Sequence, residues 1–330
     1  MNTFGRIFRV SIFGESHGQE VGIVMDGCPA GLSLEPDDFM EDLNRRRSGV
    51  HGTTSRREED KPRILSGIFE NKTTGTPILI AFFNRDTRSE DYSSFQDIPR
   101  PGHADFVARH KYGGYSDFKG GGHFSGRLTV ALVAAGVIAK KILSPTEIRA
   151  EILEAGGSSE IDKTIRAAQE DGDSIGGIVE CRILNLPIGL GEPFFDSTES
   201  LISHMVFSIP GIKGIEFGAG FQCSRMKGSE CNDPFIDIDG RTKSNHCGGI
   251  NAGITNGNDL VFRTAVKPPS SIAKKQTTLN IATGKKTAFS VRGRHDVCIA
   301  LRMPVILEAA AALVLADLML IEHKRPRIWR

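Results

Sequence analysis

Residues 128–143 read LTVALVAAGVIAKKIL, a stretch rich in alanine and valine with no polar face before Lys140 and Lys141. A helix that is apolar on all sides has to be buried on all sides. A second such helix is predicted to begin at Pro304, since proline is favoured in a first turn, and to run through Ala309–Ala312 toward His323. These two segments predict a fold with helices at its centre.

The rest of the chain predicts strands, shorter helices and loops around that centre. The predicted elements are strands at Phe8–Phe13, Val21–Met25, Ile64–Phe69, Pro77–Phe83 and Gly176–Leu184, and helices at Glu35–Asn44 and Ile161–Gln169, the latter opened by a capping box of Ser159 and Asp162. Residues 211–287 are glycine-rich and predict binding loops with only short strands, such as Asp259–Ala265. Because no low-complexity linker divides the sequence, we expect one α+β domain over residues 1–330.

Composition narrows the class of protein. The 330 residues carry a net charge of +1, which argues against a dedicated nucleic-acid binder. Six cysteines without a C-x-x-C pair predict reduced thiols and no metal site. The start of the chain is too polar for a signal peptide, and the longest apolar stretches are shorter than the roughly 20 residues that span a bilayer. We therefore expect a cytoplasmic protein without a membrane segment.

The segment Gly14-Glu15-Ser16-His17-Gly18 matches G-x-S-x-G, the nucleophile elbow of serine hydrolases. That motif requires a strand before the serine and a helix after it, whereas here a second strand is predicted to follow. The candidate partners also come in the order His103 then Asp296, which is not the order of that fold. A serine hydrolase remains an alternative.

Arg45-Arg46-Arg47 opens the most basic segment of the chain, which continues through His51, Arg56, Arg57, Lys61 and Arg63. Such a run is either a solvated face paired with Glu58–Asp60 or a set of guanidinium groups placed around a phosphate or carboxylate. A non-enzymatic anion- or RNA-binding protein is the alternative that this segment leaves open.

Three further segments combine titratable groups with turns. They are Arg100–Asp105 with His103 after a Pro-Gly turn, Lys119–Arg127 with three successive glycines before the first buried helix, and Arg292–Cys298 with Asp296 before the second. A histidine in a turn can act as a general acid, and a glycine loop lets backbone N–H groups approach an anion. None of them is a Walker or Rossmann loop, so ATP and Rossmann-bound NAD have no support.

Taken together and in this order, the motifs resemble those of the chorismate synthase family. To the segments already quoted the resemblance adds Asn84 to Tyr92, Lys111–Gly113, Gly172–Gly177, Ser244-Asn245 with Gly248-Gly249, and Lys267–Ser271. So many collinear motifs cover nearly the whole chain, which a single motif would not do.

The resemblance implies a β-α-β sandwich in which central helices lie between two antiparallel sheets, assembled as a homotetramer. It also implies a lyase reaction of aromatic amino-acid biosynthesis, the 1,4-anti elimination of phosphate from 5-enolpyruvylshikimate 3-phosphate to give chorismate. The family needs reduced FMN, although the reaction is redox-neutral. Some members reduce the flavin with NADPH and others receive reduced FMN from a separate reductase; the length of this chain favours the latter.

The resemblance also assigns roles to individual residues. His103 would protonate the departing phosphate, His17 would protonate or hydrogen-bond the flavin, and Asp296 would help to remove the C6 proton. Substrate-binding positions are Ser16, Arg46, Arg127 and Arg294. Flavin-binding positions are His123, Phe124, Ser125, Pro210, Gly211, Ala252, Lys267, Pro268, Pro269, Ser270, Ser271 and Arg294.

The sequence departs from the family pattern at three places. His123-Phe124 replaces an Arg-Ser pair at the flavin, the loop after Gly49 is about one residue shorter and carries Gly52-Thr53 near a usual substrate arginine, and Ala252-Gly253 replaces a glycine pair. We expect the first departure to weaken flavin binding, because an arginine is permanently charged and a histidine is not.

Overall fold

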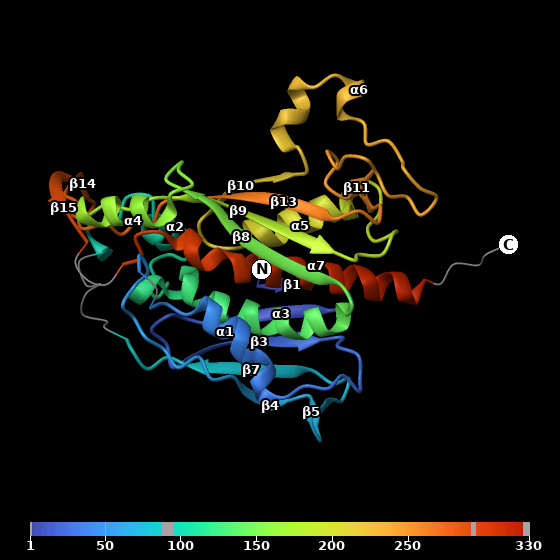
Figure 1. Cartoon of the computed structure of the whole chain (residues 1–330). Helices are drawn as coiled ribbons and strands as arrows, with labels where there is room; N and C mark the ends of the chain where they lie inside the picture. Colours follow the sequence, from blue (N-terminus) through green and yellow to red (C-terminus); the bar gives the residue numbers. More distant parts are fainter. Residues whose placement is uncertain (1, 50, 88–94, 292–294, 326–330) are drawn as a thin grey trace.

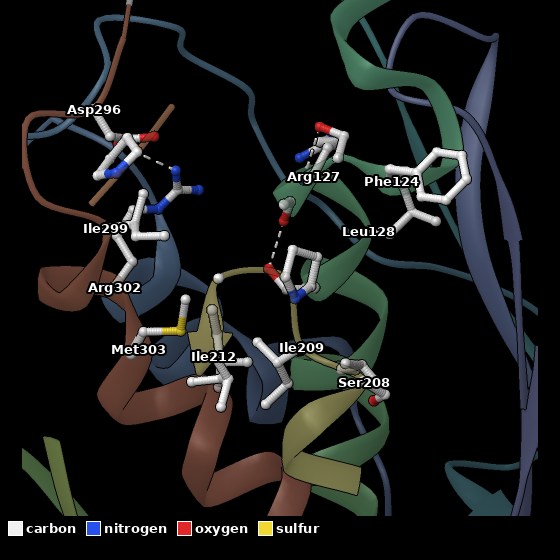
Figure 2. A pocket seen from close by; sticks show the side chains of 18 of the residues that line it. Phe124, Arg127, Leu128, Ser208, Ile209, Ile212, Asp296, Ile299, Arg302 and Met303 are labelled. Carbon is white, nitrogen blue, oxygen red and sulfur yellow. Dashed lines mark hydrogen bonds and ion pairs between the residues drawn. The ribbon is translucent and has the colours of Figure 1, made fainter. Parts of the chain in front are cut away.

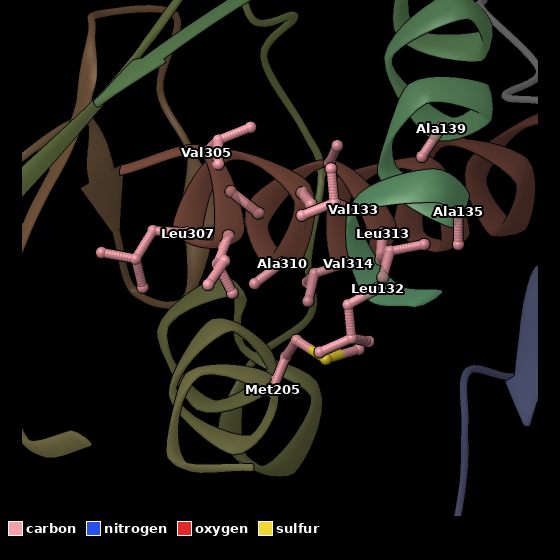
Figure 3. Packing of buried hydrophobic residues seen from close by; sticks show 14 of the residues in the cluster. Leu132, Val133, Ala135, Ala139, Met205, Val305, Leu307, Ala310, Leu313 and Val314 are labelled. Carbon is pink, nitrogen blue, oxygen red and sulfur yellow. The ribbon is translucent and has the colours of Figure 1, made fainter. Parts of the chain in front are cut away.

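Helices α3 (Thr129–Leu143) and α7 (Met303–Lys324) form the centre of the molecule, as their apolar sequences predict (Figure 1). The computed structural model describes residues 2–49, 51–87, 95–291 and 295–325. The two helices cross where Gly136 meets Ala309: a Cβ on Gly136 would lie 2.3 Å from that of Ala309, so the approach requires a glycine. Figure 3 shows Leu132, Leu313 and Met205 packed together around this crossing.

Two antiparallel sheets cover the helix layer from opposite sides (Figure 1). The first has the order β1-β2-β3-β7-β4 and the second β10-β13-β9-β8. The strands are β1 Thr3–Phe4, β2 Arg9–Gly14, β3 Glu20–Asp26, β4 Arg63–Ser66, β7 Ile78–Phe83, β8 Glu147–Ala155, β9 Gly177–Leu184, β10 Ile212–Phe217 and β13 Leu260–Val266. The expected sandwich with central helices is therefore confirmed.

The alternation of apolar and polar side chains along each strand determines which face of the sheet packs against the helices. In β7, Ile78, Ile80 and Phe82 are buried, and in β8 the partly buried Ile148 and Ile152 alternate with charged residues.

Shorter helices and hairpins surround the sheets and the central helices. The helices are α1 (Met40–Arg46) after the short helix η1 (Pro36–Phe39), α2 (Asp105–Lys111), α4 (Ile161–Glu170), α5 (Thr198–Phe207) and α6 (Gly228–Cys231). The hairpins are β5–β6 (Ile68–Phe69, Lys72–Thr73), β11–β12 (Ile250–Asn251, Ile254–Thr255) and β14–β15 (Gln276–Asn280, Lys285–Phe289). One hydrophobic cluster spans both sheets and the helices, which supports our proposal that the chain is one domain.

Two local predictions were wrong. The strand predicted at Ile64–Phe69 is two strands, because Gly67 at φ +82° bends the chain between β4 and β5. No capping box opens α4: Glu160 is its N-cap, and Ser158 Oγ accepts from the Glu160 N–H. The strand predicted at Asp259–Ala265 is confirmed as β13, shifted by one residue, and β10 and the β14–β15 hairpin also lie within residues 211–287.

Helix α7 is long and apolar enough to cross a membrane by length and composition. Most of it is buried in the core between the sheets, including the run Ala309–Ala312. The end of α1 and the beginnings of α3 and α7 meet at one end of the helix layer, and this is where the long loops converge.

Candidate active site

A cavity of about 980 Å³ opens at that end of the helix layer. Its floor is apolar and is formed by Ile209, Ile212 and Met303 (Figure 2). Arg127 and Phe124 lie on one side of it, and Asp296 and Arg302 lie on the opposite side. This volume is typical of pockets that bind small organic molecules. The charged side chains of the cavity lie in its walls and not in its floor.

His103 is held from behind by a buried carboxylate. Its Nδ1 lies 2.7 Å from Asp105 Oδ1 and 3.0 Å from Arg100 Nη2. A carboxylate oxygen only accepts, so Nδ1 carries a proton and donates to Asp105. Arg100, which can only donate, binds the same carboxylate through Nε and Nη2. Burial raises the pKa of the Asp105 carboxyl, but the hydrogen bonds from Arg100 and His103 outweigh it and hold that pKa far below its ordinary value. The fixed ring leaves Nε2 as the nitrogen that can exchange a proton with a ligand in the cavity.

Two buried arginines share the carboxylate of Asp60. Arg46 Nη2 donates to Asp60 Oδ2 at 2.7 Å, and Arg127 Nη1 donates to Oδ1. Arg127 also donates to Asn84 Oδ1 at 2.9 Å. Burial favours the neutral acid of Asp60, yet the two guanidinium charges lower its pKa overall. Two cations and one anion leave a net positive charge in the cavity wall.

Ser16 and His17 lie directly behind the glycine loop that borders the cavity. Ser16 Oγ accepts from Arg56 Nη1 at 2.9 Å, and its N–H donates to Gly122 O at 3.1 Å. The His17 ring packs against Gly120, whose φ of +59° requires glycine. Burial, and next the charge of Arg56, lower the pKa of His17. Both effects favour the neutral form of the His17 ring.

Asp296 faces the cavity from the segment before α7. Its Oδ1 accepts from the Thr54 N–H at 2.9 Å and lies 3.6 Å from Arg302 Nη1. Arg302 Nε also donates to Arg46 O at 2.9 Å. One arginine thus joins this carboxylate to the end of α1.

Lys267 closes the loop 267–271 onto the turn that carries His103. Its Nζ donates to Gly102 O at 2.7 Å and to Ser270 Oγ at 2.9 Å. Burial, together with the charge of Lys213, lowers the pKa of Lys267. Ser271 Oγ accepts from Arg100 Nη1 at 3.1 Å, so the loop and the turn form one wall.

The cavity brings together most of the residues that the sequence singles out. Those that line it are Arg46, His103, His123, Phe124, Ser125, Arg127, Pro210, Gly211, Lys267, Pro269, Ser270, Ser271 and Asp296. Pro268 is not among the lining residues, and Ala252 lies at the exposed turn of the β11–β12 hairpin, away from the cavity. Arg294 and the segment Arg88–Tyr92 lie outside the described residues.

Sequence reasoning did not assign roles to three charged residues at this site. Arg56, Arg100 and Arg302 line the cavity and hold Ser16, Asp105 and Asp296, respectively. Arg56 and Arg100 belong to motifs that were recognised. Arg302 follows an apolar turn with no pattern of its own, and only the fold brings it to Asp296.

The loop of Gly14–Gly18 joins β2 to β3. It is therefore a hairpin loop without the strand–turn–helix geometry of a nucleophile elbow. Part of the basic segment is directed inward: Arg46 is buried against Asp60, and Arg56 is half-buried and binds Ser16. Arg45, which pairs with Glu308, is exposed, as are His51, Arg57 and Lys61. Cations and positioned titratable groups around one cavity define an enzyme that acts on an anionic ligand. A protein that only binds anions would need the cations alone.

The comparisons with known proteins agree with this class. Residues 8–320 match the model of the family described as chorismate synthase. The chain is 60% identical to the chorismate synthase of Chitinophaga pinensis over the whole of both chains. It is 43% identical to that of Methanocaldococcus jannaschii, covering 97% of this chain and 96% of that one. A solved structure described as a crystal structure of chorismate synthase superposes with a TM-score of 0.74 at 27% identity, covering 96% and 93% of the two chains.

The chain belongs to the chorismate synthase family. It is a lyase of the shikimate pathway, and its function is the elimination of phosphate from 5-enolpyruvylshikimate 3-phosphate to give chorismate.

Proposed function

We propose that this cavity carries out the elimination with bound reduced FMN and with His103, His17 and Asp296 as its catalytic residues. The observation that carries the proposal is the convergence of His103, Asp296 and the Arg46–Asp60–Arg127 cluster on one cavity of about 980 Å³. The substrate bears a phosphate and two carboxylates, which match a wall of guanidinium groups.

The side chains fit both an anionic substrate and a flavin phosphate. Within the described part of the chain, the buried Nε atoms of Arg46 and Arg47 have no hydrogen-bond partner. Buried donors of this kind are satisfied when an acceptor binds. Lys267, Ser270 and Ser271 would hold the flavin, and the apolar floor beside Pro210 and Gly211 suits its ring system. When bound, reduced FMN supplies electron density that assists the loss of phosphate.

His103 is assigned to the departing phosphate. Since Nδ1–H is engaged by Asp105, the proton for the leaving group sits on Nε2, and Arg100 keeps Asp105 ionised behind the ring. A positioned acid of this kind contributes about 10²- to 10⁴-fold to a rate.

His17 is assigned to the flavin, and its lowered pKa favours a hydrogen-bonding role for the neutral ring over proton donation. Asp296 is assigned to the C6 proton. Thr54 and Arg302 both engage Oδ1, so we assign proton removal to Oδ2. Ser16, Arg46 and Arg127 orient the substrate around these groups, and Arg294 remains a predicted member of the same set.

We further propose a cytoplasmic homotetramer that receives reduced FMN from a separate reductase. A projecting arm, residues 218–258, extends beyond the second sheet (Figure 1). Its exposed apolar side chains include Phe221, Phe235 and Ile238, which suit contact with a second copy of the chain. The predicted flavin position Ala252 also lies on this arm, so it would reach a flavin only in the cavity of another copy.

The test is anaerobic incubation of the protein with 5-enolpyruvylshikimate 3-phosphate and chemically reduced FMN. We expect chorismate to form only with reduced flavin, and equal turnover with oxidised FMN or without flavin would refute the proposal. A serine-directed fluorophosphonate tests the hydrolase alternative and should leave Ser16 unlabelled. A gel-shift titration tests RNA binding through Arg45–Arg57 and should show no salt-sensitive complex.

A further inference from the structure

His123 contacts the loop that carries Ser16 and His17. Its Nδ1 lies 2.9 Å from Gly14 O. A carbonyl oxygen only accepts hydrogen bonds, so Nδ1 must carry the proton. Next to it, the Ser16 N–H donates to Gly122 O at 3.1 Å. Two hydrogen bonds therefore join the glycine loop of residues 120–122 and its neighbour His123 to the Gly14–Gly18 loop.

Gly14 is the residue at which the chain leaves β2. It has a φ of +96°, and a Cβ there would lie 2.3 Å from Glu20 O, so the turn is closely packed on its other side. Asn84 donates to Glu15 O and Gly18 O, and Arg56 donates to Ser16. The hydrogen bond from His123 adds the anchor at the Gly14 end of the loop. Ser16 and His17 follow within three residues.

We propose that His123 is a positioning residue, which holds the Gly14–Gly18 loop through Nδ1 and so sets where Ser16 and His17 lie. This role rests on the proposed function for its effect on catalysis, but not for its effect on the loop. It also changes the expectation for residue 123: in the neutral ring, Nδ1 donates to Gly14 and Nε2 bears a lone pair, so neither nitrogen donates into the cavity.

Two substitutions separate the nitrogens. The amide nitrogen of an asparagine lies near the position of Nδ1, whereas that of a glutamine lies near the position of Nε2. His123→Asn should keep the bond to Gly14 O, and His123→Gln should lose it. We expect a loss of about tenfold in kcat/KM for His123→Gln, the scale of one hydrogen bond, and near-normal values for His123→Asn. Tyr115→Ser is the control, because Tyr115 lies shortly before the glycine loop, is 94% exposed and does not line the cavity.

Hydrogen exchange provides a readout without catalysis. In His123→Gln, the amides of residues 15–18 should exchange faster than in the wild type, while His123→Asn and Tyr115→Ser should leave them unchanged. In His123→Gln, the FMN affinity measured by calorimetric titration should change by a smaller factor than the exchange rates of these amides. The proposal is overturned if glutamine preserves and asparagine loses the function, if both variants behave as wild type, or if both fail equally.

A measurement on the wild-type chain covers the case in which His123→Gln does not fold. In protein labelled with ¹⁵N-histidine, the resonance absent from the His123→Asn spectrum belongs to His123, and it should report the Nδ1–H tautomer. An Nε2–H tautomer would exclude donation to Gly14. If the tautomer and the exchange agree with the proposal while the wild type forms no chorismate, the proposed function fails and the positioning role stands.

Discussion

Gly120 lies so close to His17 that a methyl group on Gly120 would come within 2.3 Å of the ring carbon Cδ2. Gly120→Ala would therefore displace the imidazole and also place alanine at a φ of +59°. We expect chorismate formation to fall by roughly tenfold or more, the effect of a misplaced catalytic group. Gly126→Ala is the control, because a methyl group there has nothing within 4 Å. Steady-state kinetics of the two variants decide the matter, and equal activities would contradict the assigned role of His17.

The pair of His103 and Asp105 makes a second prediction. His103→Ala should lower kcat by about 10²- to 10⁴-fold, since it removes the proposed acid. Asp105→Asn should also lower kcat strongly, because an amide cannot hold the same tautomer and charge behind the ring. KM should change less than kcat in both variants. A normal rate in His103→Ala would remove this residue from the mechanism.

Asp296→Asn should abolish most turnover while FMN remains bound. The substitution deletes a base but keeps its shape and the acceptor for Thr54 N–H. Calorimetric titration should give an FMN affinity close to that of the wild type, while the rate under anaerobic conditions falls by about 10²-fold or more. If the variant loses FMN binding as well as turnover, Asp296 would instead be assigned to cofactor binding.

The sequence predicted the centre of the fold because a helix that is apolar on all sides is stable only when other elements bury it on all sides. It did not predict β8, although Ile148, Ala150 and Ile152 alternate with charged residues. The pairing strand β9 and the contacting helix α7 are both distant in sequence. The sequence also predicted a single strand at Ile64–Phe69, because the pattern of apolar side chains does not reveal that the chain bends at Gly67.

The site followed the same rule. Motifs gave the residue types, and the resemblance gave their roles, but the pairings depend on long-range packing. The contact of Arg302 with Asp296 and the contact of His123 with Gly14 arise only where separate segments meet. Ala252 is the clearest case: its motif predicts a flavin contact, whereas within one chain it lies away from the cavity.

Stability against acid should depend on Asp60. Its pKa is lowered in the folded protein by Arg46 and Arg127, so the stabilisation is complete above the unfolded value of about 4 and is lost as the pH falls through the folded value. Asp60→Asn leaves two buried cations without their anion and should cost about 3 kcal/mol at pH 7. The thermal midpoints of the variant and the wild type should stay apart down to about pH 4 and converge over the range below it. A constant difference over that range would place the effect in packing.

The projecting arm links assembly to flavin binding. Phe221 and Phe235 on this arm are 79% and 75% exposed. Contact with a second copy of the chain would remove these apolar rings from water. If the chain forms the proposed homotetramer, replacing both by serine should dissociate it in analytical ultracentrifugation. Phe69→Ser is the control, since Phe69 is 68% exposed but lies in β5, beside the other sheet. If Ala252 of one copy completes the flavin site of another, the arm variant should also bind FMN at least tenfold more weakly, the scale of one to two kcal/mol. Dissociation with unchanged FMN affinity would remove Ala252 from the flavin site, and a tetramer that persists would show that the arm does not hold it together.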